Sequence, residues 1–192
     1  MLPRHLSPLV LLAAVMLAAG CDEGPVGPQG PPGPPGRSET AVYTENFRFY
    51  LSDAERSEDG FTTAVPYELD LPPSIADDGA VFLYYRAYGT WTAAPTTVGV
   101  EAPNDPPRVD YTVTLGYGYD VDFLEVYLEA SSADQAVWDA IAETQGLFTE
   151  AGIGDPDGVR MKAVLLEDLA AAAKRSVDFS DYEEVARVYD LE

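Results

Sequence analysis

Alternating apolar and polar positions predict strands over much of the chain after residue 40. Residues 43–51 place their apolar side chains on one parity, as a strand with one buried face requires. Residues 109–119 carry an apolar or aromatic side chain at every odd position and are the clearest strand. After Asp120 the apolar set moves to positions 124, 126 and 128, so a turn or bulge must separate two strands.

Three further segments complete the predicted strands. Residues 61–71 contain Pro66, which favours a sheet edge because proline donates no ladder hydrogen bond. Residues 80–88 are the most continuously apolar stretch after residue 40 and predict a central strand, and residues 159–166 supply the last strand. Residues 89–107 are expected to be rich in loops, with Trp91 near their start.

Helical signals come late in the chain. Residues 132–135 and 180–183 each have the spacing of a capping box, in which Ser132 and Ser180 would cap a helix. Residues 167–175 are rich in alanine and favour another helix. The pattern therefore predicts a mainly β domain over residues 39–192, an antiparallel β-sandwich with two or three short helices toward the C-terminus.

A different regularity occupies residues 24–38. Glycine stands at every third position, at Gly24, Gly27, Gly30, Gly33 and Gly36, and proline follows it in four of the five triplets. A collagen triple helix needs this spacing because only glycine fits at its axis, but a single polyproline II spacer suits the same composition. A homotrimer and a monomeric spacer both remain open. Either one predicts an extended stalk of about 45 Å at ~3.1 Å per residue.

The first twenty residues have the features of a cleaved secretory signal. Arg4 and His5 form a short positive segment, and an apolar stretch follows over residues 9–19. This stretch is shorter than the roughly 20 residues that span a membrane as a helix. Residues 17–21 resemble the lipobox of bacterial lipoproteins, which implies cleavage before Cys21 and a membrane anchor through lipid on Cys21. An ordinary signal peptide is the alternative.

The net charge of the chain limits the kinds of molecule that it can bind. The 33 acidic residues and ten of the 11 basic residues follow residue 20, which gives that part a net charge of −23. Because neutralising phosphates needs lysine and arginine, we exclude nucleic acid as a partner. The acidic surface suits either a salty environment or the binding of divalent cations, and composition does not separate the two.

Few of the side chains that most enzymes need are present. His5 is the only histidine and Cys21 the only cysteine, and in the expected mature chain one is removed and the other lipidated. Nucleophilic catalysis with a histidine base and zinc sites of histidine and cysteine are thereby excluded. We expect no enzyme and no cofactor. A glycosidase that uses two carboxylates is the remaining enzymatic hypothesis.

Five residues are candidates for ligand binding. Asp155 and Asp157 lie in a segment similar to the start of a calcium loop, although a plain turn is the simpler interpretation. Asp120 and Asp122 flank the change of parity and could converge with another loop. Trp91 could offer a ring on which a sugar stacks, although aromatic side chains on strands more often pack within the sheet.

Three segments together resemble a group of small bacterial surface lipoproteins with a lipobox cysteine, a few Gly-X-Y triplets and one uncharacterised β-rich domain. They are residues 21–36, 109–129 and 177–185. The resemblance implies a surface location and brings no catalytic residues. We expect an exported protein anchored in the outer membrane or at the cell surface of a Gram-negative bacterium.

Three parts follow: a signal peptide over residues 1–20, a lipidated stalk over 21–38 and a folded domain over 39–192. We expect a lipid-anchored, non-enzymatic protein for adhesion, binding or envelope structure, with a surface glycan or protein as its ligand. A carbohydrate- or calcium-dependent binding module is the alternative.

Overall fold

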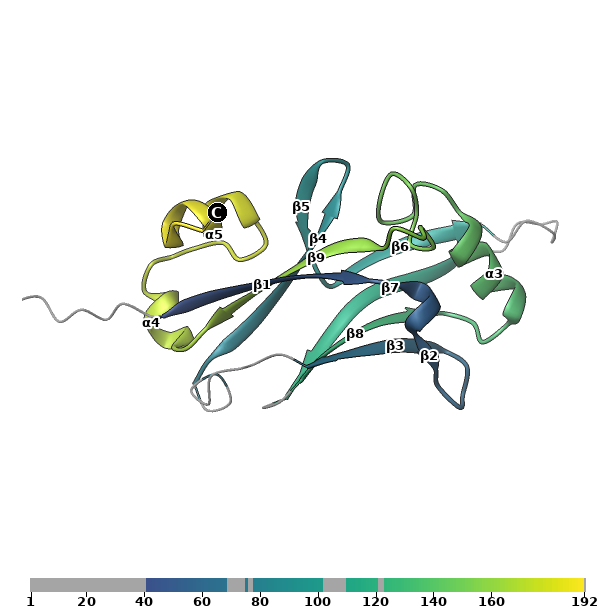
Figure 1. The fold of residues 1–192 in the computed structure, drawn as a ribbon, viewed down its shortest axis with the longest axis horizontal. Coiled ribbons are helices and arrows are strands. Elements are labelled where there is room, and N and C mark those ends of the chain that lie inside the picture. Colours follow the sequence, from purple (N-terminus) through teal and green to yellow (C-terminus); the bar gives the residue numbers. More distant parts are fainter. Residues whose placement is uncertain (1–40, 69–74, 76–77, 102–109, 121–122, 192) are drawn as a thin grey trace, which may run out of the picture. The chain divides into compact units, whose positions relative to one another are not determined.

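A computed structural model describes residues 41–68, 75, 78–101, 110–120 and 123–191 of the chain, which Figure 1 shows in colour. The chain divides after Arg37 into two units, and every described residue belongs to the second, Ser38–Glu192. The signal segment, Cys21, the five glycines of the triplets and Asp122 lie outside the described residues. None of the described helices is both long and apolar enough to cross a membrane.

The second unit is mainly β, and its strands form two antiparallel sheets. Sheet A contains, in spatial order, β1 (Val42–Phe49), β9 (Val159–Leu166), β4 (Ala80–Ala87) and β5 (Thr90–Ala93). Sheet B contains β2 (Glu55–Arg56), β3 (Thr62–Glu68), β8 (Phe123–Ala130), β7 (Asp110–Tyr119) and β6 (Thr96–Glu101). The long apolar stretch of β4 is an interior strand, as predicted, between β9 and β5.

A β-hairpin between β7 and β8 explains the change of parity near Asp120. Tyr119 pairs with Leu124, and the backbone N–H of Asp120 donates to the carbonyl of Phe123 at 3.0 Å. Leu115 on β7 pairs with Leu128 on β8, and both side chains are fully buried. The turn therefore brings the odd positions of one strand and the even positions of the next to the same face of the sheet.

Pro66 lies where its missing N–H is tolerated. It pairs with Glu125 of β8 on one side of β3. The short strand β2 covers only Thr63 and Ala64 on the other side. No outer ladder hydrogen bond is needed at Pro66, which is the condition under which proline occurs in sheets.

The expectation of a loop-rich segment after residue 88 is wrong for the part that the structure describes. β5 and β6 occupy most of residues 90–101, with the cis Ala94–Pro95 peptide bond between them. β5 pairs with β4 in sheet A, whereas β6 pairs with β7 in sheet B. Threonine and valine favour strands, but the neighbouring glycines and prolines obscured two segments this short.

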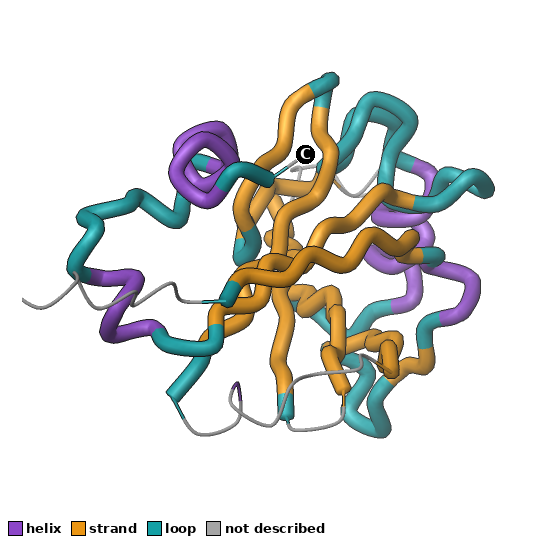
Figure 2. The backbone as a smooth tube through the Cα atoms, turned by 60° about the vertical axis from the view of Figure 1, so that its left-hand side comes forward, coloured by secondary structure: helices purple, strands orange, loops and turns teal. Residues whose placement is uncertain are grey.

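Three described α-helices accompany the sheets: α3 (Gln135–Glu143), α4 (Leu169–Ala173) and α5 (Tyr182–Tyr189). A short 3-10 helix, η1 (Leu51–Asp53), follows β1. Aspartates, and not the predicted serines, cap α3 and α5. The carboxylate of Asp134 accepts from the N–H of Ala136, and that of Asp181 accepts from two N–H groups of α5. Serine and aspartate cap equally well, so adjacent candidates left the starting residue ambiguous. α3 contacts β6 of sheet B, and Figures 1 and 2 place α4 and α5 at the opposite end of the sheets.

Two apolar cores hold these elements together. The larger one contains buried residues of both sheets, such as Leu83 and Met161 of sheet A and Leu115 of sheet B. The smaller one joins the outer face of sheet A to α5 through residues such as Val164 and Val185. Almost every residue of β9 is buried because this strand contributes to both cores.

Candidate functional site

The outer face of sheet A changes from apolar to cationic along its strands. Because successive side chains of a strand alternate between faces, the outward positions run from Leu166 to Arg160 on β9 and from Phe82 to Arg86 on β4. On β1 they end at Arg48. The smaller core covers the apolar half of this face, and the cationic half lies beyond it.

Arg48, Arg160 and Arg86 lie level with one another on three neighbouring strands. Arg48 pairs directly with Arg160 across β1 and β9. The ladder between β4 and β9 pairs Tyr85 with Met161, so Arg86 and Arg160 occupy the next opposed positions. We call these three residues the arginine row.

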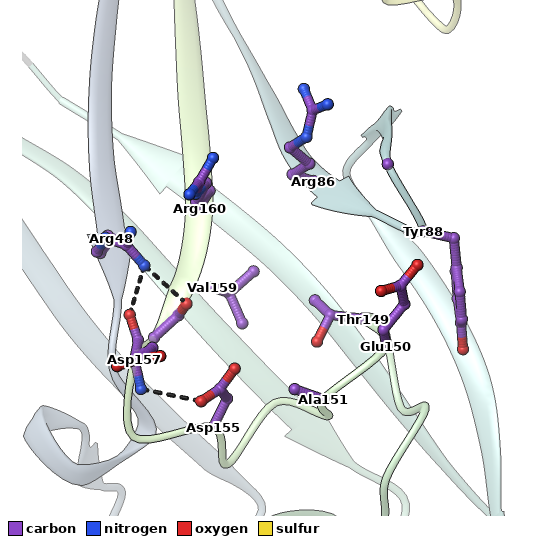
Figure 3. Close-up of a pocket in the computed structure, with 12 residues that line it drawn as sticks. Arg48, Arg86, Tyr88, Thr149, Glu150, Ala151, Asp155, Asp157, Val159 and Arg160 are labelled. Atoms are coloured by element: carbon purple, nitrogen blue, oxygen red, sulfur yellow. Dashed lines mark hydrogen bonds between the residues drawn. The ribbon is translucent and has the colours of Figure 1, made fainter.

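The three arginines differ in what holds them. Nη1 of Arg48 donates to the main-chain carbonyls of Asp157 and Gly158, as Figure 3 shows. The guanidinium carbon of Arg86 lies 5.6 Å from the centroid of a Trp91 ring. Neither Arg86 nor Arg160 forms an ion pair with a described residue. In Figure 3 the side chain of Arg86 points away from the loop that carries Asp155.

Repulsion between the three arginines is expected to lower the stability of sheet A. Like charges directly opposite one another destabilise a sheet, and the chain has a net charge of −22 that would supply partners elsewhere. Four of the eight basic residues that the structure describes nevertheless lie on this face: the arginine row and Lys162. The eight are Arg48, Arg56, Arg86, Arg160, Lys162, Lys174, Arg175 and Arg187. Arg48, Arg86 and Lys162 each have a structural contact on this face, and together with Arg160 they concentrate positive charge there.

Two open depressions flank the row. One, of about 390 Å³, lies between the arginines and residues 149–158, and Glu150, Asp155 and Asp157 contribute to its lining (Figure 3). The other, of about 320 Å³, has no described acidic residue in its lining. We call it the Trp91 hollow, and its lining residues are Asn46, Phe47, Arg48, Trp91, Arg160 and Met161.

Lys162 is buried beside the row, with 5 % of its surface exposed. Its Nζ donates to the hydroxyl of Tyr182 at 2.7 Å. The same atom lies 5.0 Å from the ring centroid of Trp91 and 4.9 Å from that of Tyr182. Attraction between the cation and the two rings offsets part of the lost hydration, and it ties β5, β9 and α5 together.

Trp91 lies on strand β5 and not in the loop that its surroundings suggested. It is half-buried, with its ring 5.6 Å from that of Tyr182 between centroids. The structure brings it together with Arg48 and Arg160, which the sequence reasoning did not single out. In the sequence, each of the strands β1, β9 and β4 has an arginine at the end of its outward-facing positions. Only the pairing of these distant strands shows that the three arginines are neighbours.

Asp155 and Asp157 form a turn. The carboxylate of Asp155 accepts from the N–H of Asp157 at 2.9 Å, and the N–H of Gly158 donates to the carbonyl of Asp155 at 2.8 Å. Gly158 has φ of +71°, which glycine adopts without strain. Aspartate commonly stabilises turns in this way. The described residues include no group of three or more histidine, cysteine, aspartate or glutamate side chains placed to hold a metal ion.

Asp120 lies apart from these residues in the chain's architecture. It follows β7 in the hairpin of sheet B. It lines neither the Trp91 hollow nor the larger depression.

Tyr84 supports the outer face of sheet A from the smaller core. Its hydroxyl donates to the carbonyl of Phe179 at 2.8 Å, next to the start of α5. Burial, with smaller contributions from nearby tyrosines and aspartates, raises the pKa of Tyr84 well above its ordinary 10.0. The hydroxyl and N–H of Ser180 donate to Asp178 and lower the pKa of that carboxyl. These bonds hold the segment that leads into α5.

Fold and site together define a two-sheet antiparallel β domain with a cationic row on one outer face. No family model, curated protein or solved structure matches the chain.

Proposed function

We propose that this chain is a lipid-anchored, non-enzymatic binding module of a bacterial envelope, and that the arginine row holds its anionic partners. The row itself carries this proposal. Arginine is always charged, less strongly hydrated than lysine, and forms paired hydrogen bonds with carboxylate and sulfate groups. In an otherwise acidic protein, a local positive surface directs an anion to one place and repels it from the rest.

The display part of the proposal rests on the sequence. Lipid on Cys21 tethers the chain to the outer membrane or cell surface, and residues 24–38 raise the domain as a stalk, either as one chain or as a homotrimer. In the same proposal the two sheets, which share the larger core, are the two layers of a β-sandwich.

Metabolic labelling with palmitate tests the anchor. We expect label on the full chain expressed in a Gram-negative host and none on the Cys21→Ser variant, because the lipid is attached through the thiol. A wild-type chain without label contradicts the anchor and leaves the binding surface to be judged separately.

Retention on immobilised dextran sulfate tests the binding surface. The full chain, in a non-ionic detergent, should bind and elute as salt screens the arginines. The variant Arg48→Gln, Arg86→Gln, Arg160→Gln should lose retention.

A matched control keeps this test specific to the row. The variant Lys174→Gln, Arg175→Gln, Arg187→Gln removes the same charge from α5 and from the segment that follows α4, and should be retained like the wild type. Equal losses in both triple variants mean that overall charge governs retention, which contradicts the proposal.

A further inference from the structure

We infer that the Trp91 hollow binds a carboxylated sugar, such as a uronic-acid unit of an acidic polysaccharide. This inference rests on the proposed function and names the ligand class of the same surface. The hollow combines an aromatic ring, two guanidinium groups and an amide: those of Trp91, Arg48, Arg160 and Asn46. Each of these groups has a counterpart on such a sugar.

Arg48 and Arg160 provide the recognition of a carboxylate. They pair directly across β1 and β9, so their side chains leave the same face of the sheet side by side. Arg48 uses Nη1 for the carbonyls of Asp157 and Gly158, which holds the group in place and leaves its other N–H donors for a ligand. Arg160 is exposed and has no carboxylate partner among the described residues. Two arginines in this arrangement suit a planar carboxylate.

Trp91 and Asn46 provide the recognition of a sugar ring. The contacts of Trp91 with Lys162 and Tyr182 already hold its ring, so little side-chain freedom is lost on binding. Lys162 and Arg86 already lie over the indole, so a pyranose packs its C–H groups against the part of the ring that stays exposed in the hollow. The exposed amide of Asn46 can donate to and accept from hydroxyls. A bare sulfate or phosphate would leave both residues unused.

The two depressions differ in how well they can hold an acidic polysaccharide. The volume of the Trp91 hollow, about 320 Å³, is at the small end of ligand sites and suits a short portion of a polysaccharide. The larger depression is lined by all three arginines of the row, but Glu150, Asp155 and Asp157 also line it and repel the carboxylates of an acidic chain. The acidic chain is therefore held on the Trp91 side of the row.

Calorimetric titration of the full chain with oligogalacturonate, in a non-ionic detergent, tests the inference. The methyl ester of the same oligosaccharide is the matched ligand, because it keeps the sugar and removes the charge. We expect binding of the acid and at least about tenfold weaker binding of the ester, since hydrogen bonds to a charged group are lost.

Conservative variants separate a shaped site from a simple cation. Arg160→Lys keeps the charge but loses the planar fork, and should weaken oligogalacturonate binding about tenfold while retention on dextran sulfate stays nearly unchanged. Trp91→Phe keeps an aromatic ring against α5 and should weaken the binding of oligogalacturonate several-fold. Arg187→Lys is the control, because this side chain is exposed on α5 away from the hollow's lining, and it should change neither binding nor retention. Circular dichroism confirms that each variant is folded.

The outcomes distinguish this inference from the proposed function. Retention on dextran sulfate without measurable binding of oligogalacturonate overturns the inference and leaves the proposed function standing. Failure of both probes overturns both. Equal affinity for the acid and its ester, or unchanged affinity in folded Arg160→Lys, also overturns the inference.

Discussion

The hydroxyls of two tyrosines in helix α5 contribute differently to stability because their surroundings differ. The hydroxyl of Tyr182 accepts from the buried ammonium of Lys162 at 2.7 Å. The hydroxyl of Tyr189 is buried with no hydrogen-bond partner among the described residues. A buried polar group without a partner costs free energy, whereas one that compensates a buried charge stabilises the fold.

Substituting each tyrosine by phenylalanine should therefore have opposite consequences. We expect Tyr182→Phe to lower the free energy of unfolding by about 1–2 kcal/mol, because Lys162 loses one of its compensating groups. Tyr189→Phe should leave that free energy unchanged or raise it slightly, since the hydroxyl removed had no partner. Urea unfolding followed by circular dichroism measures both, and equal losses would contradict the assignment.

At the scale of single elements, strand β7 contains two glycines with different surroundings. Gly116 pairs with Tyr127 of β8, whose ring lies over it, so that an added Cβ would come within 2.6 Å of the ring. Gly118 pairs with Glu125, and an added Cβ would meet nothing within 4 Å. Gly116 makes room for the Tyr127 ring. Gly118 has no such role, and it adds conformational freedom to the unfolded chain.

Alanine substitutions should separate these two roles. Gly116→Ala should cost about 1–2 kcal/mol of unfolding free energy, since the Tyr127 ring has to move. Gly118→Ala should be neutral or stabilise by up to about 1 kcal/mol, because the unfolded chain loses freedom and the sheet loses nothing. Thermal unfolding of the two single variants checks this, and a loss in Gly118→Ala as large as in Gly116→Ala would contradict it.

Across the whole domain, buried tyrosines link stability to alkaline pH. Burial raises the pKa of Tyr67 and Tyr117 above their ordinary 10.0, and these two residues pack against the larger core. The same cause raises the pKa of Tyr84 in the smaller core and of Tyr85 in the larger. Both cores thus contain hydroxyls that ionise in the unfolded chain before they ionise in the folded domain.

Stability should therefore be lost at high pH. Below about pH 10 both states hold these protons and the contribution is complete. Above it the unfolded state binds fewer protons than the folded state, so the free energy of unfolding falls as pH rises toward the raised pKa values. Absorbance at 295 nm and far-ultraviolet circular dichroism should show part of the tyrosines ionising together with unfolding. Complete ionisation near pH 10 in a still-folded domain would contradict this.

Local pattern was sufficient for much of the fold. The period-two alternation of β7 and β8, and the parity change between them, predicted two strands separated by a turn or a bulge. The structure shows a turn that joins them as an antiparallel pair. The interior place of β4 followed from its continuous apolar stretch. The short strands β5 and β6 were missed because four or six residues carry too little periodicity against nearby glycine and proline.

The candidate site lay beyond local pattern for a physical reason. Composition and the lone histidine and cysteine restrict the chemistry of the chain wherever those residues lie, so they could be used without coordinates. Trp91 was noticed for its type, but its neighbours Arg48 and Arg160 are separated from it by 43 and 69 positions. Strand register is set by turns, by cross-strand packing and by the face of each strand that a core buries. Because β1, β4 and β9 are distant in the sequence, only their pairing in the fold shows that the three arginines lie level.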